Sequence, residues 1–151
     1  MSRDPWKLEV FCLADDLVVR IYNATQNFPE EERFGLRAQL RRAALSVPAN
    51  LVEGCARDSS KDYVHFVNIA FSSACETRYL LHVAHRLAFI GNDEYADLAR
   101  AYDRVCKALN RLQTSLKAML RERRTTRRQK RTQLSSKAGQ GVALKAVEQK
   151  T

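Results

Sequence analysis

Apolar residues recur at three- and four-residue spacing along four long stretches of the chain, which is the pattern of amphipathic helices. The stretches cover about residues 5–27, 29–54, 61–90 and 92–120, and only short connections separate them. Long helices joined by short connections predict an all-α fold, an antiparallel up-down four-helix bundle.

The first stretch has two lines of apolar residues. Asp4 is its expected N-cap and Pro5 its first helical residue. The expected core stripe is Trp6, Val10, Leu13, Leu17, Ile21, Ala24 and Phe28. A second line, Phe11, Val18 and Tyr22, lies on another side and indicates a further contact surface.

The second stretch carries Pro48 near its middle. Proline removes a backbone donor and clashes with the preceding turn, which costs about 3 kcal/mol in a helix interior. We therefore expect a helix kink at Pro48, supported by tertiary packing.

A polar strip runs beside the core face of this second helix. It comprises Gln39, Arg42, Ser46, Asn50 and Glu53, and Glu76 on the third helix faces the same region. Such residues form either a binding site or a polar seam that fixes the register between helices or subunits, and we favour the structural seam. For Arg41 and Arg42 two roles are open. We expect them either to neutralise Glu53 or Glu76, or to face a ring lumen and bind phosphate.

The far side of the same helix is small and apolar, where a surface helix is normally charged. We expect an oligomer interface at Ala38, Leu45, Ala49 and Val52, joined by Val64, Val67 and Phe71 of the third helix. Apolar surface beyond one core face predicts a homo-oligomer, most simply a closed ring or dimer.

The formal net charge of +9 is distributed unevenly. Residues 121–151 hold ten Lys/Arg against two Glu, a net of +8, whereas residues 1–120 hold 16 Lys/Arg against 15 Asp/Glu, a net of +1. This contrast predicts a four-helix bundle over residues 1–122 and a basic, disordered tail over residues 123–151.

The basic residues are the best functional candidates. The expected nucleic-acid contacts are Arg100, Arg104, Lys107, Arg111, Arg121, Arg123, Arg124, Arg127, Arg128, Lys130 and Arg131. Cations in this density attract a phosphate backbone and release its counterions. The alternative is a solvated helix face with a solubilising tail. Because no base-reading motif is present, we expect binding of low sequence specificity.

Other chemistry finds little support. The four cysteines are scattered, with no spacing for zinc or a disulfide framework. His82 and His85 lack a third ligand in register, and Asp62 and His65 lack the repeats of a di-iron site. No nucleophile elbow or phosphate loop is present, so we expect no enzyme, cofactor or metal. No stretch approaches the roughly 18 apolar residues of a membrane span, and a cytoplasmic protein is expected.

An ordered set of residues in the second and third helices resembles a known family. The set is Phe28-Pro29, Gly35-Leu36, Gln39 to Ala43, Ser46 to Asn50, Glu53-Gly54, Arg57, Ser59, Phe66, Ile69-Ala70, Ser73 and Glu76. It is similar to the small four-helix bundle proteins encoded in intervening sequences of bacterial large-subunit (23S) ribosomal RNA genes, and it covers about residues 6–120.

This resemblance implies a four-helix bundle that assembles into a pentameric ring and associates with nucleic acid, most simply RNA. Relatives include the accessory protein of diversity-generating retroelements, which works with a reverse transcriptase. The resemblance therefore leaves a second hypothesis, in which the chain is a protein-interaction scaffold or accessory subunit of a reverse transcriptase or RNA-processing protein.

Overall fold

The computed structural model describes the backbone of residues 3–148 and the side chains of residues 3–129. Four α-helices and two 3-10 turns follow one another along the chain: η1 (Pro5–Lys7), α1 (Glu9–Ala24), η2 (Glu30–Arg33), α2 (Leu36–Cys55), α3 (Ser60–Arg86) and α4 (Asn92–Glu148). No strand occurs between residues 3 and 148, which confirms the all-α prediction. The chain divides into two compact units, the first ending at Leu116 and the second beginning at Lys117.

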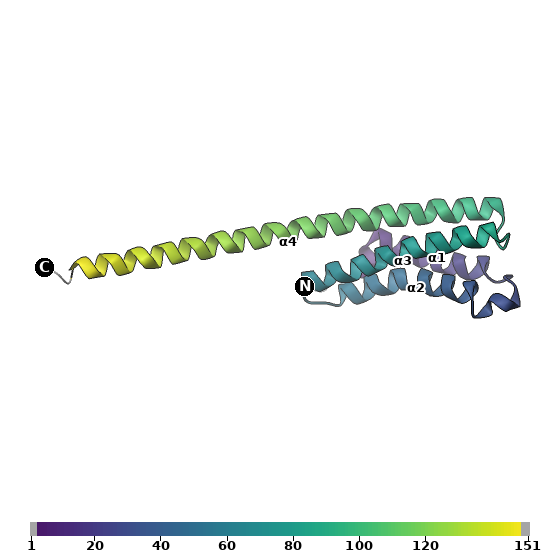
Figure 1. Ribbon diagram of the computed structural model, residues 1–151, viewed down its shortest axis with the longest axis horizontal. Coiled ribbons are helices and arrows are strands. Elements are labelled where there is room, and N and C mark those ends of the chain that lie inside the picture. Colours follow the sequence, from purple (N-terminus) through teal and green to yellow (C-terminus); the bar gives the residue numbers. More distant parts are fainter. Residues whose placement is uncertain (1–2, 149–151) are drawn as a thin grey trace. The chain divides into compact units, whose positions relative to one another are not determined.

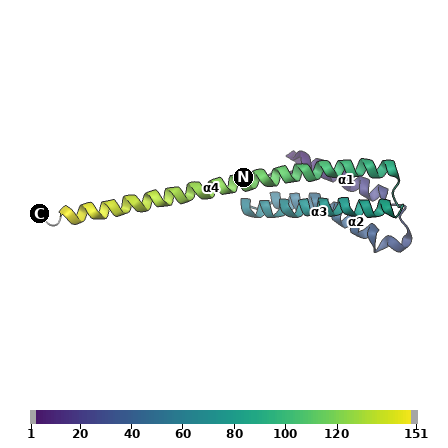
Figure 2. The ribbon, with the colours of Figure 1, turned by 45° about the horizontal axis from the view of Figure 1, so that its top comes forward.

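The first unit has one hydrophobic core to which all four helices contribute. In both views of the ribbon, α2 and α3 lie side by side (Figure 1 and Figure 2). The largest fully buried side chains include Ile21, Leu40, Leu51, Leu81, Leu98, Tyr102 and Leu109. Each buried leucine or isoleucine stabilises the fold by about 1.5–3 kcal/mol relative to an exposed one. Packing of the predicted helix faces thus holds this unit together.

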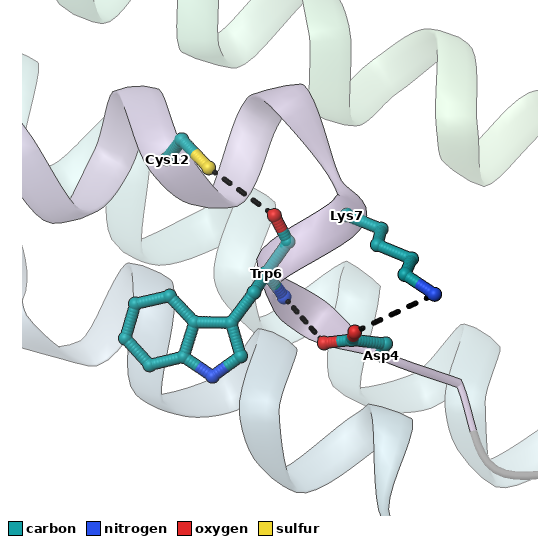
Figure 3. A network of polar contacts seen from close by, with 4 residues as sticks. All are labelled: Asp4, Trp6, Lys7 and Cys12. Carbon is teal, nitrogen blue, oxygen red and sulfur yellow. Dashed lines mark hydrogen bonds and ion pairs between the residues drawn. The ribbon is translucent and has the colours of Figure 1, made fainter.

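The chain enters the bundle through a capped turn, shown in Figure 3. Asp4 accepts a hydrogen bond from the Trp6 backbone N–H at 3.0 Å, so it caps η1 and not α1. Leu8 then adopts an extended conformation before α1 begins at Glu9. This break shifts the phase of the helix, so Trp6 is 68% exposed, against prediction, while Phe11 belongs to the core.

A second turn precedes α2, where the sequence predicts one helix from Pro29. Gly35 has φ −94° and ψ −127°, outside the helical region, and it separates η2 from α2. The Glu32 carboxylate accepts a hydrogen bond from the Leu36 backbone N–H at 2.7 Å. The Glu32 side chain therefore satisfies one of the free backbone donors at the start of α2.

Helix α2 continues across Pro48, which is itself buried. The proline deprives the Ala44 carbonyl of its usual donor. Two residues further on, the Asn50 side-chain amide donates to the Ser46 carbonyl at 2.7 Å. Buried Leu40 on one side of the proline and Leu51 on the other supply the tertiary packing that the sequence requires.

Helix α3 ends at Arg86, a turn before residue 90, where the third stretch was predicted to end. Ala88 has φ 58°, the left-handed conformation typical of a helix C-terminus. The Ala88 N–H donates to the His85 carbonyl and the Phe89 N–H donates to the Ala84 carbonyl, both at 2.9 Å. This paired arrangement is a Schellman motif, built here on alanine in place of the expected glycine.

The second unit continues helix α4, and its backbone is helical up to Glu148. The disorder of residues 123–151 in solution stays a prediction. Thr125 and Thr126 donate their hydroxyls to the carbonyls of Arg121 and Glu122. Arginine, glutamine and alanine favour helix even where no apolar stripe exists. Among the described residues, no helix has an apolar run of the length needed to cross a membrane.

Candidate nucleic-acid interface

The buried stripe of α4 determines which of its side chains face outward in the first unit. Leu98, Tyr102, Val105 and Leu109 are buried in the core. The predicted basic line, Arg100, Arg104, Lys107 and Arg111, is exposed. Its spacing of four, three and four residues keeps the four cations on one side of the helix. The structure therefore places them together on a solvent-facing strip, which we call the α4 basic line.

The members of the α4 basic line differ in their counterions. Arg100 lies 3.6 Å from the Asp97 carboxylate, which also pairs with Arg20 at 2.5 Å. Within residues 3–129, no ion pair involves Arg104, Lys107 or Arg111. These three charges thus remain available to an external anion.

The second unit carries its own group of cations. Arg121, Arg123, Arg124, Arg127 and Arg128 are all exposed, and Glu122 is the single acid among residues 117–129. The side chains of Lys130 and Arg131, also predicted to contact nucleic acid, lie outside the described residues. Because five arginines lie within eight residues, the second unit has a cationic surface of its own.

The predicted polar seam joins α2 to α3 within one chain. Arg42 donates to the side-chain oxygen Oε1 of Gln39, and Gln39 Nε2 donates to the Glu76 carboxylate at 3.2 Å. One turn on, the Ser46 hydroxyl meets the Ser73 hydroxyl at 2.9 Å. These contacts favour the structural interpretation of the strip.

Two seam residues behave differently from the prediction. Glu53 pairs with Arg57 of the following turn instead of joining the seam. Ser73, which lies outside the predicted seam, supplies the hydroxyl partner of Ser46. Its position one helical turn from Glu76 is the sequence signal that links it to the seam.

Arg41 has a role that the sequence did not indicate. Its Nε donates to the Thr25 hydroxyl at 2.7 Å and its Nη2 to the Tyr22 carbonyl at 3.2 Å. The guanidinium also lies 4.6 Å from the centroid of the Tyr22 ring. Arg41 therefore ties α2 to the end of α1 and pairs with neither Glu53 nor Glu76.

The expected interface residues divide between surface and core. Leu45 is 49% exposed, Val52 is 44% exposed, and Ala49 between them is also exposed. Ala38 and Val64 are half-buried, and Phe71 packs against the core. Val67 lies fully in the core at 0% exposure, because the buried stripe of α3 passes through it, so it cannot reach a partner. The surface strip on α2 therefore consists of Ala38, Leu45, Ala49 and Val52, which we call the α2 apolar strip.

His82 and His85 contact Tyr95 of α4. The His82 ring nitrogen lies 3.4 Å from the Tyr95 hydroxyl, and the His85 ring stacks on the Tyr95 ring at 4.3 Å. His85 Nδ1 also lies 3.2 Å from the Ile90 carbonyl. Among the residues that the structure describes, no group of three or more His, Cys, Asp or Glu side chains is placed to hold a metal ion.

Comparison with known proteins supports the fold and the family. A family model described as 23S rRNA-intervening sequence protein matches residues 6–111. The crystal structure of a protein of unknown function from the S23 ribosomal protein family of Bacteroides thetaiotaomicron has 26% sequence identity and a TM-score of 0.65. The match covers 70% of this chain and 95% of that chain.

Among curated proteins, none matches this chain. The family match spans most of the chain and confirms the resemblance seen in its second and third helices. The chain belongs to the 23S rRNA-intervening sequence protein family.

Proposed function

We propose that this protein is a non-catalytic, homo-oligomeric helical bundle that binds RNA or other nucleic acid with low sequence specificity. The observation that supports this function best is the α4 basic line, in which Arg104, Lys107 and Arg111 are exposed and pair with no acid among residues 3–129. Cations without a counterion bind phosphate with little loss of existing interactions.

Low specificity follows from the kind of side chains on this surface. Arginine and lysine at helical spacing meet phosphates along a backbone, and such contacts position a nucleic acid without reading its bases. The five described arginines of the second unit, Arg121 to Arg128, add the same chemistry. The dominant energy is therefore counterion release, and affinity should fall steeply with salt.

We propose an antiparallel up-down arrangement for the bundle. Its support is the order of the contacts between α2 and α3, because Gln39 meets Glu76, Ser46 meets Ser73, and Gly54 lies against Tyr63. Residue numbers rise along one helix as they fall along the other, which is the pattern of neighbouring antiparallel helices.

The homo-oligomer is proposed from the α2 apolar strip. Leu45 and Val52, each more than 40% exposed, lie two turns apart on one side of α2. Burying such a strip against a copy of the chain removes apolar surface from water, and closed symmetry gives each copy the same environment. The family resemblance makes a pentameric ring the expected form.

The proposed function can be tested with a labelled RNA hairpin in a fluorescence-anisotropy titration at several salt concentrations. The triple variant Arg104→Gln, Lys107→Gln, Arg111→Gln should bind at least about 10-fold more weakly at low salt. The steepness of its plot of log K against log salt should fall by about 2–3, since three phosphate contacts are lost. The triple variant should lose affinity by the same factor for RNA hairpins of unrelated sequence.

A matched control removes three positive charges elsewhere on the first unit. Arg33, Lys61 and Arg86 are exposed and lie outside α4, so their replacement by glutamine gives the same change in net charge. Affinity within about threefold of the wild-type value is expected for this control, because only long-range attraction changes. Equal weakening by both triples, or no binding of RNA or DNA by the wild type at low salt, would refute the proposal.

A second candidate function is that of an accessory subunit for a nucleic-acid enzyme such as a reverse transcriptase or RNA-processing protein. The observation in its favour is exposed apolar surface, including Phe34 at 88% exposure as well as the α2 apolar strip. Deleting residues 123–151 would leave capture of such a partner intact if apolar contacts hold it. Loss of capture on this deletion would count against this candidate.

A further inference from the structure

Two cysteine side chains from different helices meet in the first unit. Cys75 Sγ of α3 lies 3.9 Å from Cys106 Sγ of α4. Cys75 is exposed and Cys106 is half-buried. The other two cysteines are engaged elsewhere, since Cys12 donates to the Trp6 carbonyl and Cys55 is buried in the core. Cys75 and Cys106 therefore form a distinct thiol pair.

A hollow in the surface gives access to one member of this pair. It has a volume of about 290 Å³ and is lined by Cys75, Arg78, Tyr79, His82 and Tyr95. A water molecule occupies about 30 Å³ in the liquid, so a molecule of the size of hydrogen peroxide fits inside. Cys106 does not line the hollow, so a small reagent that enters it meets Cys75 and not Cys106.

The surroundings assign different roles to the two sulfurs. Burial raises the pKa of the Cys106 thiol to about 12, and the neighbouring Cys75 adds to the rise. Cys106 thus stays protonated at neutral pH and is a poor nucleophile toward an outside reagent. The accessible Cys75 is the sulfur that reacts first, and Cys106 is placed to react with the product.

We propose that Cys75 and Cys106 are a redox modification site, which a hydroperoxide converts into an intramolecular disulfide between α3 and α4. In the first step, the sulfur of Cys75 attacks one oxygen of the peroxide, its thiol proton leaves and the O–O bond breaks. Cys75 becomes a sulfenic acid, and the departing hydroxide leaves as one water by taking up the thiol proton.

In the second step, the sulfur of Cys106 attacks the sulfur of Cys75, and the S–O bond breaks. The Cys106 proton leaves with the hydroxyl group as a second water. In total, two thiols lose two electrons and two protons, and the peroxide is reduced to two waters. A dithiol reductant converts the Cys75–Cys106 disulfide back to two thiols by thiol-disulfide exchange.

The geometry permits this closure with a small movement. A disulfide needs a sulfur separation of about 2.0 Å, so the two atoms must approach by roughly 2 Å. Rotation of the exposed Cys75 side chain about its Cα–Cβ bond moves its sulfur without disturbing the core. The resulting bond would close a loop of about 30 residues, which restricts the unfolded chain and raises the melting temperature.

The full-length protein treated with one equivalent of hydrogen peroxide tests the proposal. Intact mass should fall by two hydrogen atoms, and denaturing alkylation should label two of the four cysteines. Peptide mapping without reductant should join the Cys75 peptide to the Cys106 peptide. The melting temperature should rise by roughly 5–15 °C and return to its original value after dithiothreitol treatment.

Three serine variants distinguish this pair from general thiol oxidation. Cys75→Ser and Cys106→Ser should each abolish the mass loss and the rise in melting temperature. Cys12→Ser, which removes the other exposed thiol, should change neither. The proposal would be overturned by disulfides between chains or by a Cys75 that gains oxygen without forming a disulfide. Oxidation of Cys12 to the same extent as Cys75 would also overturn it.

Discussion

The Ser46 hydroxyl of α2 lies 2.9 Å from the Ser73 hydroxyl of α3, and this hydrogen bond joins the two helices close to Pro48. Asn50 donates to the same Ser46 hydroxyl at 2.9 Å. Ser73 is buried, so water cannot replace a lost partner there. The contact therefore fixes how α2 and α3 meet at the point where the proline weakens α2.

Ser46→Ala and Ser73→Ala should each lower the free energy of unfolding by about 1 kcal/mol, because the remaining hydroxyl loses its partner. The double variant should lose less than the sum of the two single variants, with a coupling energy of about 0.5–1 kcal/mol. Urea unfolding followed by circular dichroism measures these values. Ser72→Ala is the control, since Ser72 is exposed and, among the described residues, its hydroxyl bonds to the Asn68 carbonyl of its own helix. Additive effects of Ser46→Ala and Ser73→Ala would contradict the assigned contact.

Gly54→Ala should destabilise the bundle by about 1 kcal/mol, although alanine normally favours a helix. A Cβ at this position would lie 2.9 Å from the Phe66 Cβ and 3.2 Å from the Tyr63 ring, so α2 and α3 would have to separate. Overpacking of this kind costs about 1–3 kcal/mol, against a gain in helix propensity of about 1 kcal/mol. Thermal unfolding of the two proteins gives the difference.

Gly91→Ala is the matched control for Gly54→Ala. Apart from Gly91 and its two chain neighbours, no described residue has an atom within 4 Å of a Cβ built at Gly91, and the φ of Gly91 is not positive. Alanine there should be neutral or raise stability by about 0.5 kcal/mol, by restricting the unfolded chain. A Gly54→Ala protein more stable than the wild type would show that the two helices can separate at no cost.

The sequence predicted the helices well because the apolar spacing reports directly on burial. The fourth predicted helix, over residues 92–120, buries a stripe of Leu98, Tyr102, Val105 and Leu109 at helical spacing. The ends of helices were less predictable, since they depend on single side chains. Glu32 capping Leu36 and the Schellman motif at Ala88 are local solutions that composition does not reveal.

The candidate site was only partly predictable for a different physical reason. Exposure of Arg104 and Lys107 follows from helical phase alone, and the structure agrees. Contacts between helices depend on packing in three dimensions, which one chain's periodicity does not determine. This is why the link from Arg41 to Thr25 and the thiol pair were not foreseen.

Ala88→Gly should raise the free energy of unfolding by about 0.5–1 kcal/mol. The φ of 58° at Ala88 forces its Cβ toward a carbonyl oxygen, a strain of about 1–2 kcal/mol that glycine lacks. Part of this gain is lost because glycine gives the unfolded chain more freedom. Ala96→Gly is the control of opposite sign. Ala96 is exposed inside α4, so glycine there should lower the free energy of unfolding by about 1 kcal/mol. Chemical unfolding of both variants checks the sign, and destabilisation by Ala88→Gly would contradict the strained turn.

Leu45→Glu should dissociate the proposed homo-oligomer while leaving each chain folded. Leu45 is half exposed in the single chain, so the carboxylate costs little there, but burial against a copy would require desolvating a charge. Light scattering should show a wild-type mass that is a multiple of 17.3 kDa and a Leu45→Glu mass near 17.3 kDa, with unchanged helicity. Val19→Glu is the control, since Val19 is 61% exposed on α1, outside the α2 apolar strip, and should keep the wild-type mass. A wild-type protein that already has the mass of one chain would refute the assembly, and dissociation by Val19→Glu would move the interface to α1.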